Sequence, residues 1–231
     1  AGFVTVNGKI VKNNYKIKPG DEIISMSLIN PEHTVLKREN IPLNIVFEDD
    51  TFMIINKPPN MVVHPGVGNY SGTLLNGVAY YLEQQNPTID EEALPRFGLV
   101  HRIDKNTTGL IVLGKTPAAA ANLAKQFFNH TVKRRYVALV WGDMEKEEGT
   151  ITGHIARHQQ HRNMFTVYPE GETGKHAITH YKVLERFNYV TLVECVLETG
   201  RTHQLPVHMK RTGNTLFNDW EYGGDKILKG T

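Results

Sequence analysis

The group of the chain best suited to chemistry is a carboxylate in a short polar segment with cationic side chains on both sides. Asp104 follows His101-Arg102 and precedes Lys105, between the apolar segments 97–100 and 109–113. We expect both segments to be buried strands joined by the polar loop. An aspartate in such a loop can act as an anionic nucleophile at neutral pH without a base to activate it. The alternative is an aspartate that only caps its own turn, which is common.

A second pattern lies directly after this loop. Residues 109–116, GLIVLGKT, match the phosphate-loop pattern G-x-x-x-x-G-K-[ST] letter for letter. Such a loop binds phosphates with backbone N–H groups that are free because a strand has already ended. Here the four intervening residues are Leu, Ile, Val and Leu, which favour the strand itself. We therefore predict that the chain uses no nucleotide cofactor.

Three histidines have a spacing that could hold a metal ion. His154, His158 and His161 would share one face of a helix. Their neighbours include Arg157 and further polar or cationic residues, and no nearby Cys or carboxylate completes a ligand set. The segment indicates a basic loop that contacts phosphates, and we predict no metal site.

The elements that position these groups are mostly strands. Helices are expected over 73–85, from the Thr116-Pro117 start signal to about residue 129, and over 204–211 despite Pro206. Strands are expected at 4–6, 23–26, 45–47, 52–55, 136–141, 164–167, 180–184 and 190–197, with a linker over 30–41. Because the strands do not alternate strictly with helices, the pattern predicts an α+β fold with a mixed, mostly antiparallel central sheet flanked by helices and loops.

Composition sets limits on partners. The 231 residues carry a formal net charge of only +2, and the basic residues gather in short groups such as 133–135 and 210–211. The one cysteine, Cys195, cannot form an internal disulfide, which fits the reducing cytosol and predicts a cytoplasmic protein. No apolar stretch approaches the ~18–20 residues of a membrane span, so no membrane partner is expected. We expect a monomer.

Several motifs together resemble one enzyme family. Residues 101–110, HRIDKNTTGL, resemble the H-R-[LI]-D-x-x-T-[ST]-G-L signature of the RluA/RluD family of pseudouridine synthases, and the chain has an RluD-like character. The segment around Tyr136, residues 199–204 and residues 216–225 resemble further motifs of that family. Residues 6–21 resemble the second half of the small alpha-L RNA-binding module. We accordingly expect a partial module and linker over 1–38 and a catalytic domain, C-terminally incomplete, over 39–231.

The resemblance implies an enzyme that isomerises specific uridines to pseudouridine in RNA, with large-subunit ribosomal RNA as the expected partner and with no cofactor or metal. Asp104 would attack C1′ of the uridine or stabilise its developing positive charge. Tyr136 would stack on the flipped base and help to remove the C5 proton. The residues expected to bind substrate or RNA are His101, Arg102, Lys133, Arg134, Arg157, Arg201, His203 and Gln204.

One residue departs from the family pattern. Pro206 stands where the family has an arginine that is understood to pair with the catalytic aspartate. An adjacent cation typically lowers a carboxylate pKa by ~1–3 units, and proline has no charge to offer. Arg201 or Arg102 could take its place. The alternative interpretation is a catalytically impaired relative that binds structured RNA without turnover.

Overall fold

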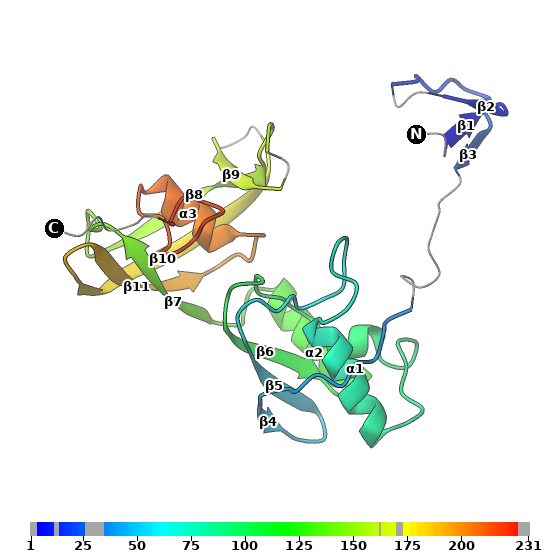
Figure 1. Ribbon diagram of the computed structural model, residues 1–231, viewed down its shortest axis with the longest axis horizontal. Helices are drawn as coiled ribbons and strands as arrows, with labels where there is room; N and C mark the ends of the chain where they lie inside the picture. The colour runs from blue at the N-terminus through cyan, green and yellow to red at the C-terminus, as the bar shows by residue number, and fades with distance from the viewer. Residues whose placement is uncertain (1–3, 12–13, 26–34, 162, 170–172, 226–231) are drawn as a thin grey trace.

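The structure is a computed structural model that describes residues 4–11, 14–25, 35–161, 163–169 and 173–225. Its strands form three sheets, and all the strand pairs within the described residues are antiparallel (Figure 1). Few helices accompany them, so the α+β class with mostly antiparallel pairing is confirmed. The strands are divided among separate sheets, whereas the sequence led us to expect one central sheet.

The small N-terminal sheet has the order β2-β1-β3 and consists of β1 (Val4–Val6), β2 (Lys9–Ile10) and β3 (Ile23–Ser25). Its hairpin turn uses Asn7 and Gly8, whose φ angles of 51° and 74° suit a tight turn between strands. The Asp21 carboxylate accepts hydrogen bonds from Asn7 Nδ2 at 2.9 Å, Tyr15 Oη at 3.1 Å and Lys18 N at 2.9 Å. The expected linker over 30–41 falls partly outside the described residues.

The first lobe, residues 35–133, contains a sheet of order β4-β5-β6 with helices packed against it. Its elements are β4 (Ile45–Glu48), β5 (Phe52–Lys57), α1 (Leu74–Gln85), the 3-10 helix η2 (Pro95–Gly98), β6 (Gly109–Gly114) and α2 (Pro117–Phe128). Both α-helices begin as the sequence predicts. Thr73 and Asn76 form a reciprocal capping box, and Thr116 Oγ1 accepts from Ala119 N at 3.2 Å ahead of Pro117.

The core of the first lobe explains why residues 109–114 form a strand. Ile111 and Leu113 of β6 are buried against Met53 and Ile55 of β5. No loop remains there to wrap a phosphate. The lysine of the matched pattern, Lys115, instead forms an ion pair with Glu48 at 2.7 Å.

One expected strand of this lobe is wrong. Residues 97–100 do not form a regular strand, because η2 covers the start of the segment and only Leu99 makes an isolated bridge, to Leu113. Pro95 leads into a turn in which Arg96, Phe97 and Gly98 all have positive φ angles, of 52°, 47° and 75°, and this left-handed backbone is incompatible with a strand. A side chain at Gly98 would strike the backbone oxygen of Gly114, so the chain passes β6 too closely for another residue.

The second lobe, residues 134–225, contains a sheet of order β7-β11-β10-β8-β9 with helix α3 beside it. Its elements are β7 (Arg134–Trp141), β8 (Glu148–Arg157), β9 (Phe165–Tyr168), β10 (Lys175–Arg186), β11 (Val190–Leu197) and α3 (Gln204–Arg211). The helix has the predicted bounds, and Pro206 fits because it lies in the first turn, where backbone N–H groups have no partner inside the helix.

The sequence did not predict β8. Its apolar residues Ile151 and Ile155 are four apart, and Gly149 and Gly153 interrupt the usual strand alternation. The glycines are required by packing: a Cβ at Gly149 would lie within 3 Å of the Tyr181 ring, and one at Gly153 would meet the Val167 side chain at 2.2 Å.

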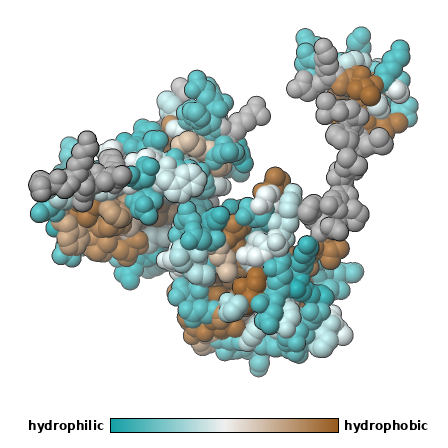
Figure 2. Space-filling view, in the orientation of Figure 1, coloured by the Kyte–Doolittle hydropathy of each residue, from teal (hydrophilic) through white to brown (hydrophobic). Residues whose placement is uncertain are grey.

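The surface of both lobes is mixed in character. Polar side chains cover much of the face seen in Figure 2, with apolar patches between them. Among the described residues, no helix has both the length and the apolar character to cross a membrane.

Candidate active site

The polar loop that carries Asp104 is fastened at both ends to the first lobe. Ile103 is buried in the core of that lobe. His101 Nε2 accepts a hydrogen bond from Val112 N at 3.0 Å, and the His101 ring stacks on Phe127 with centroids 4.2 Å apart. Burial, followed by the charge of Arg134, lowers the pKa of His101 to about 4. His101 is therefore a neutral residue that positions the loop, and its Nε2 is already occupied.

Lys57, a buried lysine that the sequence did not lead us to expect at the site, holds the other side of the loop. Lys57 is completely buried, and its Nζ donates to the carbonyl oxygens of Pro58, Met61 and Lys105 at 2.7, 2.9 and 3.0 Å. Since Lys105 is the next residue after Asp104, Lys57 connects the loop to the turn that follows β5. Burial lowers the pKa of Lys57 to about 8, while the negative charge of Asp104 acts to raise it.

A signal for this lysine is present in the sequence. Met53, Ile55 and Lys57 have the same parity on β5, and the first two face the core. Strict alternation along a strand therefore predicts that the lysine also points inward. A charged group aimed into a core requires partners, and that requirement marks the position as special.

The Asp104 carboxylate interacts with groups of both lobes. Its pKa is raised by burial, and the interactions that act against this are the charges of His203, Arg102 and Lys57 and a hydrogen bond from the backbone N–H of His203. His203 immediately precedes α3 and has a φ of 53°, a left-handed conformation that is unusual for a residue other than glycine. Such strain in the backbone is typical of functional positions.

Tyr136 lies on β7 where the two lobes meet. Its side chain packs against the core of the first lobe and also against the core of the second. Burial raises the pKa of the Tyr136 phenol, Asp104 acts in the same direction, and Arg134 opposes them. The phenol therefore stays protonated at neutral pH, close to the Asp104 carboxylate.

The segment before α3 is shaped by Gln204. This buried side chain accepts from Thr199 Oγ1 and Arg201 N and donates to Ile178 O and Thr179 Oγ1, at 2.8 to 3.0 Å. All of its amide hydrogen-bonding capacity is thus used within the protein. We expected Gln204 to bind RNA, but its hydrogen bonds instead fix the conformation of the segment that leads to His203.

The two arginines beside this segment differ in their contacts. Arg134 donates to the carbonyl oxygen of Glu198 at 2.6 Å, and its Nε is buried with no hydrogen-bond partner in the described part of the chain. Arg201 Nε donates to His176 O at 2.9 Å. Of the two proposed substitutes for the family arginine, Arg102 lowers the pKa of Asp104, whereas Arg201 is absent from the groups that do so.

The remaining residues lie farther out. Lys133 is exposed just before β7. Arg157 ends β8 with its guanidinium 5.2 Å from the centroid of the Phe165 ring. Phe165 in turn contacts the edge of the His203 ring, with centroids 5.5 Å apart, and His203 Nδ1 hydrogen-bonds Tyr222 Oη at 2.7 Å.

The three histidines of the possible metal pattern do not share a helix. His154 belongs to β8, and His158 and His161 lie in the turn that follows it. Across the described ranges, no group of three or more His, Cys, Asp or Glu side chains could hold a metal ion.

Comparison with known proteins places this arrangement in one family. The family model described as RNA pseudouridylate synthase matches residues 51–211, and the S4 domain model matches residues 1–23. An uncharacterized RNA pseudouridine synthase of Bacillus subtilis is 44% identical, over 98% of this chain and 73% of the relative. The ribosomal large subunit pseudouridine synthase D of Escherichia coli is 40% identical, over 96% of this chain and 65% of the relative.

A solved structure supports the same placement. Human RNA pseudouridylate synthase domain containing 1 matches with a TM-score of 0.64 and 25% identity, over 82% of this chain and 75% of that one. The chain belongs to the RNA pseudouridine synthase family, whose members are isomerases of uridine in RNA, and it carries a match to the S4 RNA-binding domain.

Proposed function

We propose that this chain isomerises specific uridines of large-subunit ribosomal RNA and that Asp104 is its catalytic carboxylate. The observation that carries the proposal is the setting of Asp104: a half-buried carboxylate that receives the backbone N–H of His203 from the other lobe and lies close to Tyr136. Support for the ribosomal substrate comes from relatives that are named ribosomal large subunit pseudouridine synthase D.

The reaction moves one bond. The target uridine leaves its stack, at a cost of a few kcal/mol in a paired region. Asp104 attacks C1′, or stabilises its positive charge, while the bond from C1′ to N1 breaks and the electron pair stays on the uracil. The uracil then turns and C5 bonds to C1′, displacing the Asp104 carboxylate with its electron pair if that carboxylate has bonded to C1′; C5 then loses its proton and N1 gains one. Atoms and electrons balance, and neither a cofactor nor a metal takes part.

Tyr136 serves in this scheme as the platform for the base. A protonated phenol is a poor base, and burial keeps the pKa of Tyr136 above its ordinary value. The aromatic ring can still stack on the extruded uracil, an interaction that tolerates different orientations of the base. The pKa therefore favours stacking over the removal of the C5 proton.

The cations around the site would hold the RNA backbone. Arg102, Lys133, Arg134, Arg157 and Arg201 can contact phosphates, which positions the RNA without reading its sequence. His101 and Gln204 act indirectly, because their polar atoms are engaged within the protein. We assign residues 1–38 to an RNA-binding module with its linker and residues 39–231 to catalysis.

The test uses large-subunit ribosomal RNA labelled with tritium at C5 of uridine. Formation of pseudouridine expels that hydrogen, so released tritium counts product. The expected result is release by the wild-type chain and none by Asp104→Asn, with RNA binding retained by both. Turnover by Asp104→Asn would refute the assignment of the carboxylate. RNA binding without release by the wild type would favour the impaired relative, a candidate that Pro206 recommends.

A further inference from the structure

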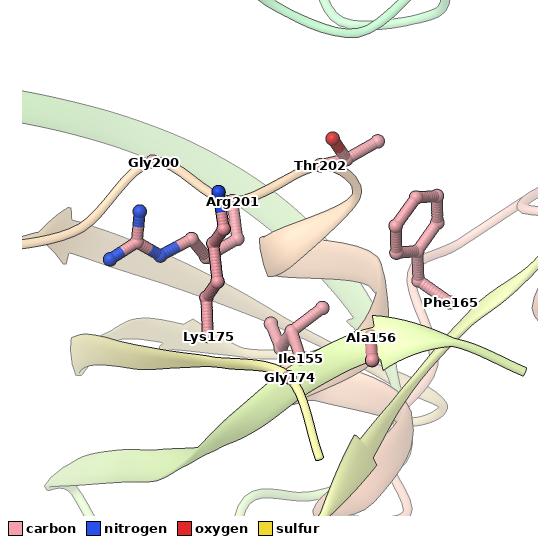
Figure 3. Close-up of a pocket in the computed structure, with 8 residues that line it drawn as sticks. All are labelled: Ile155, Ala156, Phe165, Gly174, Lys175, Gly200, Arg201 and Thr202. Carbon is pink, nitrogen blue, oxygen red and sulfur yellow. The ribbon is translucent and has the colours of Figure 1, made fainter. Parts of the chain in front are cut away.

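A pocket of about 380 Å³ lies in the second lobe, outside the groups that contact Asp104. Its volume falls in the range of about 300–1,000 Å³ that is typical of small-ligand sites. Strands β8, β9 and the start of β10 form its walls together with the segment before α3. Figure 3 shows the arrangement: Lys175 and Arg201 lie on one side, the Phe165 ring on the other, and the Thr202 hydroxyl above.

The chemistry of the lining indicates the class of ligand. Two cationic side chains and a hydroxyl group can bind a phosphate, and a phenyl ring can stack on a planar base. Among the described residues that line the pocket, none is acidic. A cationic side next to an aromatic side is suited to a nucleotide, because that ligand has an anionic end and a flat apolar end.

The position of the pocket relates it to the candidate active site. Thr202 directly precedes His203, whose backbone N–H binds Asp104. The β8 wall of the pocket is nevertheless separated from Tyr136 by the width of the sheet. In the sheet order β7-β11-β10-β8-β9, Tyr136 is on β7, whereas β8 supplies Ile155 and Ala156. Three strand spacings of about 4.8 Å separate β7 from β8, or about 14 Å.

We propose that this pocket binds a second, extruded nucleotide of the RNA, close to the target uridine in the strand. Its phosphate contacts Lys175 and Arg201, and its base packs against Phe165. The inference rests on the proposed function for the identity of the RNA, although binding of a nucleotide to the pocket can be measured without turnover.

The first experiment titrates uridine 5′-monophosphate into the ¹⁵N-labelled full chain and follows the backbone amides by NMR. We expect shifts of Gly174, Gly200 and Thr202 that are reduced at least fivefold in Lys175→Gln. The matched control is Lys182→Gln, an exposed lysine on the same strand but outside the pocket. Inorganic phosphate at equal concentration is expected to shift these amides much less. Equal shifts with phosphate, or shifts unchanged in Lys175→Gln, would overturn the proposal.

The second experiment measures tritium release against RNA concentration. Lys175→Gln should raise KM about 5- to 10-fold with kcat within twofold, and should reduce the slope of log affinity against log salt by about 0.7 for one lost contact to a single strand. Phe165→Leu should raise KM about tenfold without changing that slope. If both variants match Lys182→Gln, the pocket does not bind RNA. If the wild type releases no tritium, the proposed function fails while the titration still decides the pocket.

Discussion

Replacing Lys57 by methionine tests whether the buried lysine positions the catalytic loop. Methionine keeps an unbranched side chain of similar length and fills irregular space well. It removes the charge and leaves three carbonyl oxygens, those of Pro58, Met61 and Lys105, without their donor. The change is therefore specific to the connection between β5 and the Asp104 loop.

The magnitude follows from these three contacts. A buried polar group without a partner costs about 1–3 kcal/mol. Methionine also avoids the cost of burying an ammonium group, which offsets part of the loss, so we expect a decrease of about 2–4 kcal/mol in the free energy of unfolding. For a chain of this size 1 kcal/mol corresponds to about 2–4 °C. The melting temperature should then fall by about 4–16 °C.

Thermal unfolding and tritium release together form the assay. The control is Lys115→Met, at the far end of β6, which removes one ion pair with Glu48. The pair is half-buried, but Glu48 keeps its hydrogen bonds from Tyr81 and Gln85, so the control should lose about 1–2 kcal/mol, less than Lys57→Met. We expect Lys57→Met to lower kcat at least tenfold below the control at a temperature where both are folded. A loss of stability no greater than that of the control, with kcat within twofold of wild type, would refute the positioning role.

Three further predictions concern groups around the carboxylate. Because the ionised form of Asp104 reacts, kcat/KM should decrease as the pH falls through the raised pKa of this carboxylate. Arg102→Gln removes a cation that lowers this pKa, so it should move the decrease to higher pH. A pH profile that does not move would contradict the effect of Arg102 on Asp104. Pro206→Arg adds a cation, so it should increase kcat about threefold or more and move the decrease of kcat/KM at low pH to lower pH. If neither kcat nor the pH profile changes, Arg102 and Lys57 already stabilise the ionised form of Asp104. Tyr136→Phe should retain at least a tenth of wild-type kcat while Tyr136→Ala loses about a hundredfold, and equal losses in the tritium assay would mean that the hydroxyl takes part in the reaction.

The sequence was most informative where a local rule decides the structure. Thr116 and Pro117 start α2 as predicted, because a hydroxyl cap and a fixed proline φ act within one turn. The strand predicted from the apolar run 190–197 likewise has its predicted bounds, Val190–Leu197. In both cases the residues that determine the element belong to the element itself.

Features that depend on distant partners were missed. Gly149 and Gly153 occur in β8 because side chains of neighbouring strands occupy the space of a Cβ, which no local pattern reveals. The sequence brought Asp104 and Tyr136 to attention through motifs, but it could not show that Lys57 holds the loop. It also could not distinguish Arg102 from Arg201 as the cation that acts on the carboxylate, since that depends on where each side chain lies.

The sharing of Asp104 between two lobes has a consequence for their docking. The second lobe contributes the charge and the backbone N–H of His203, both of which lower the pKa of Asp104 against the rise caused by burial. By linkage, these two interactions favour docking of the lobes when the carboxylate is ionised. A phosphate backbone in contact with cations of both lobes would add to this attraction. The RNA would thus help to assemble the site that modifies it, and the two lobes would be held together most tightly when the RNA is bound.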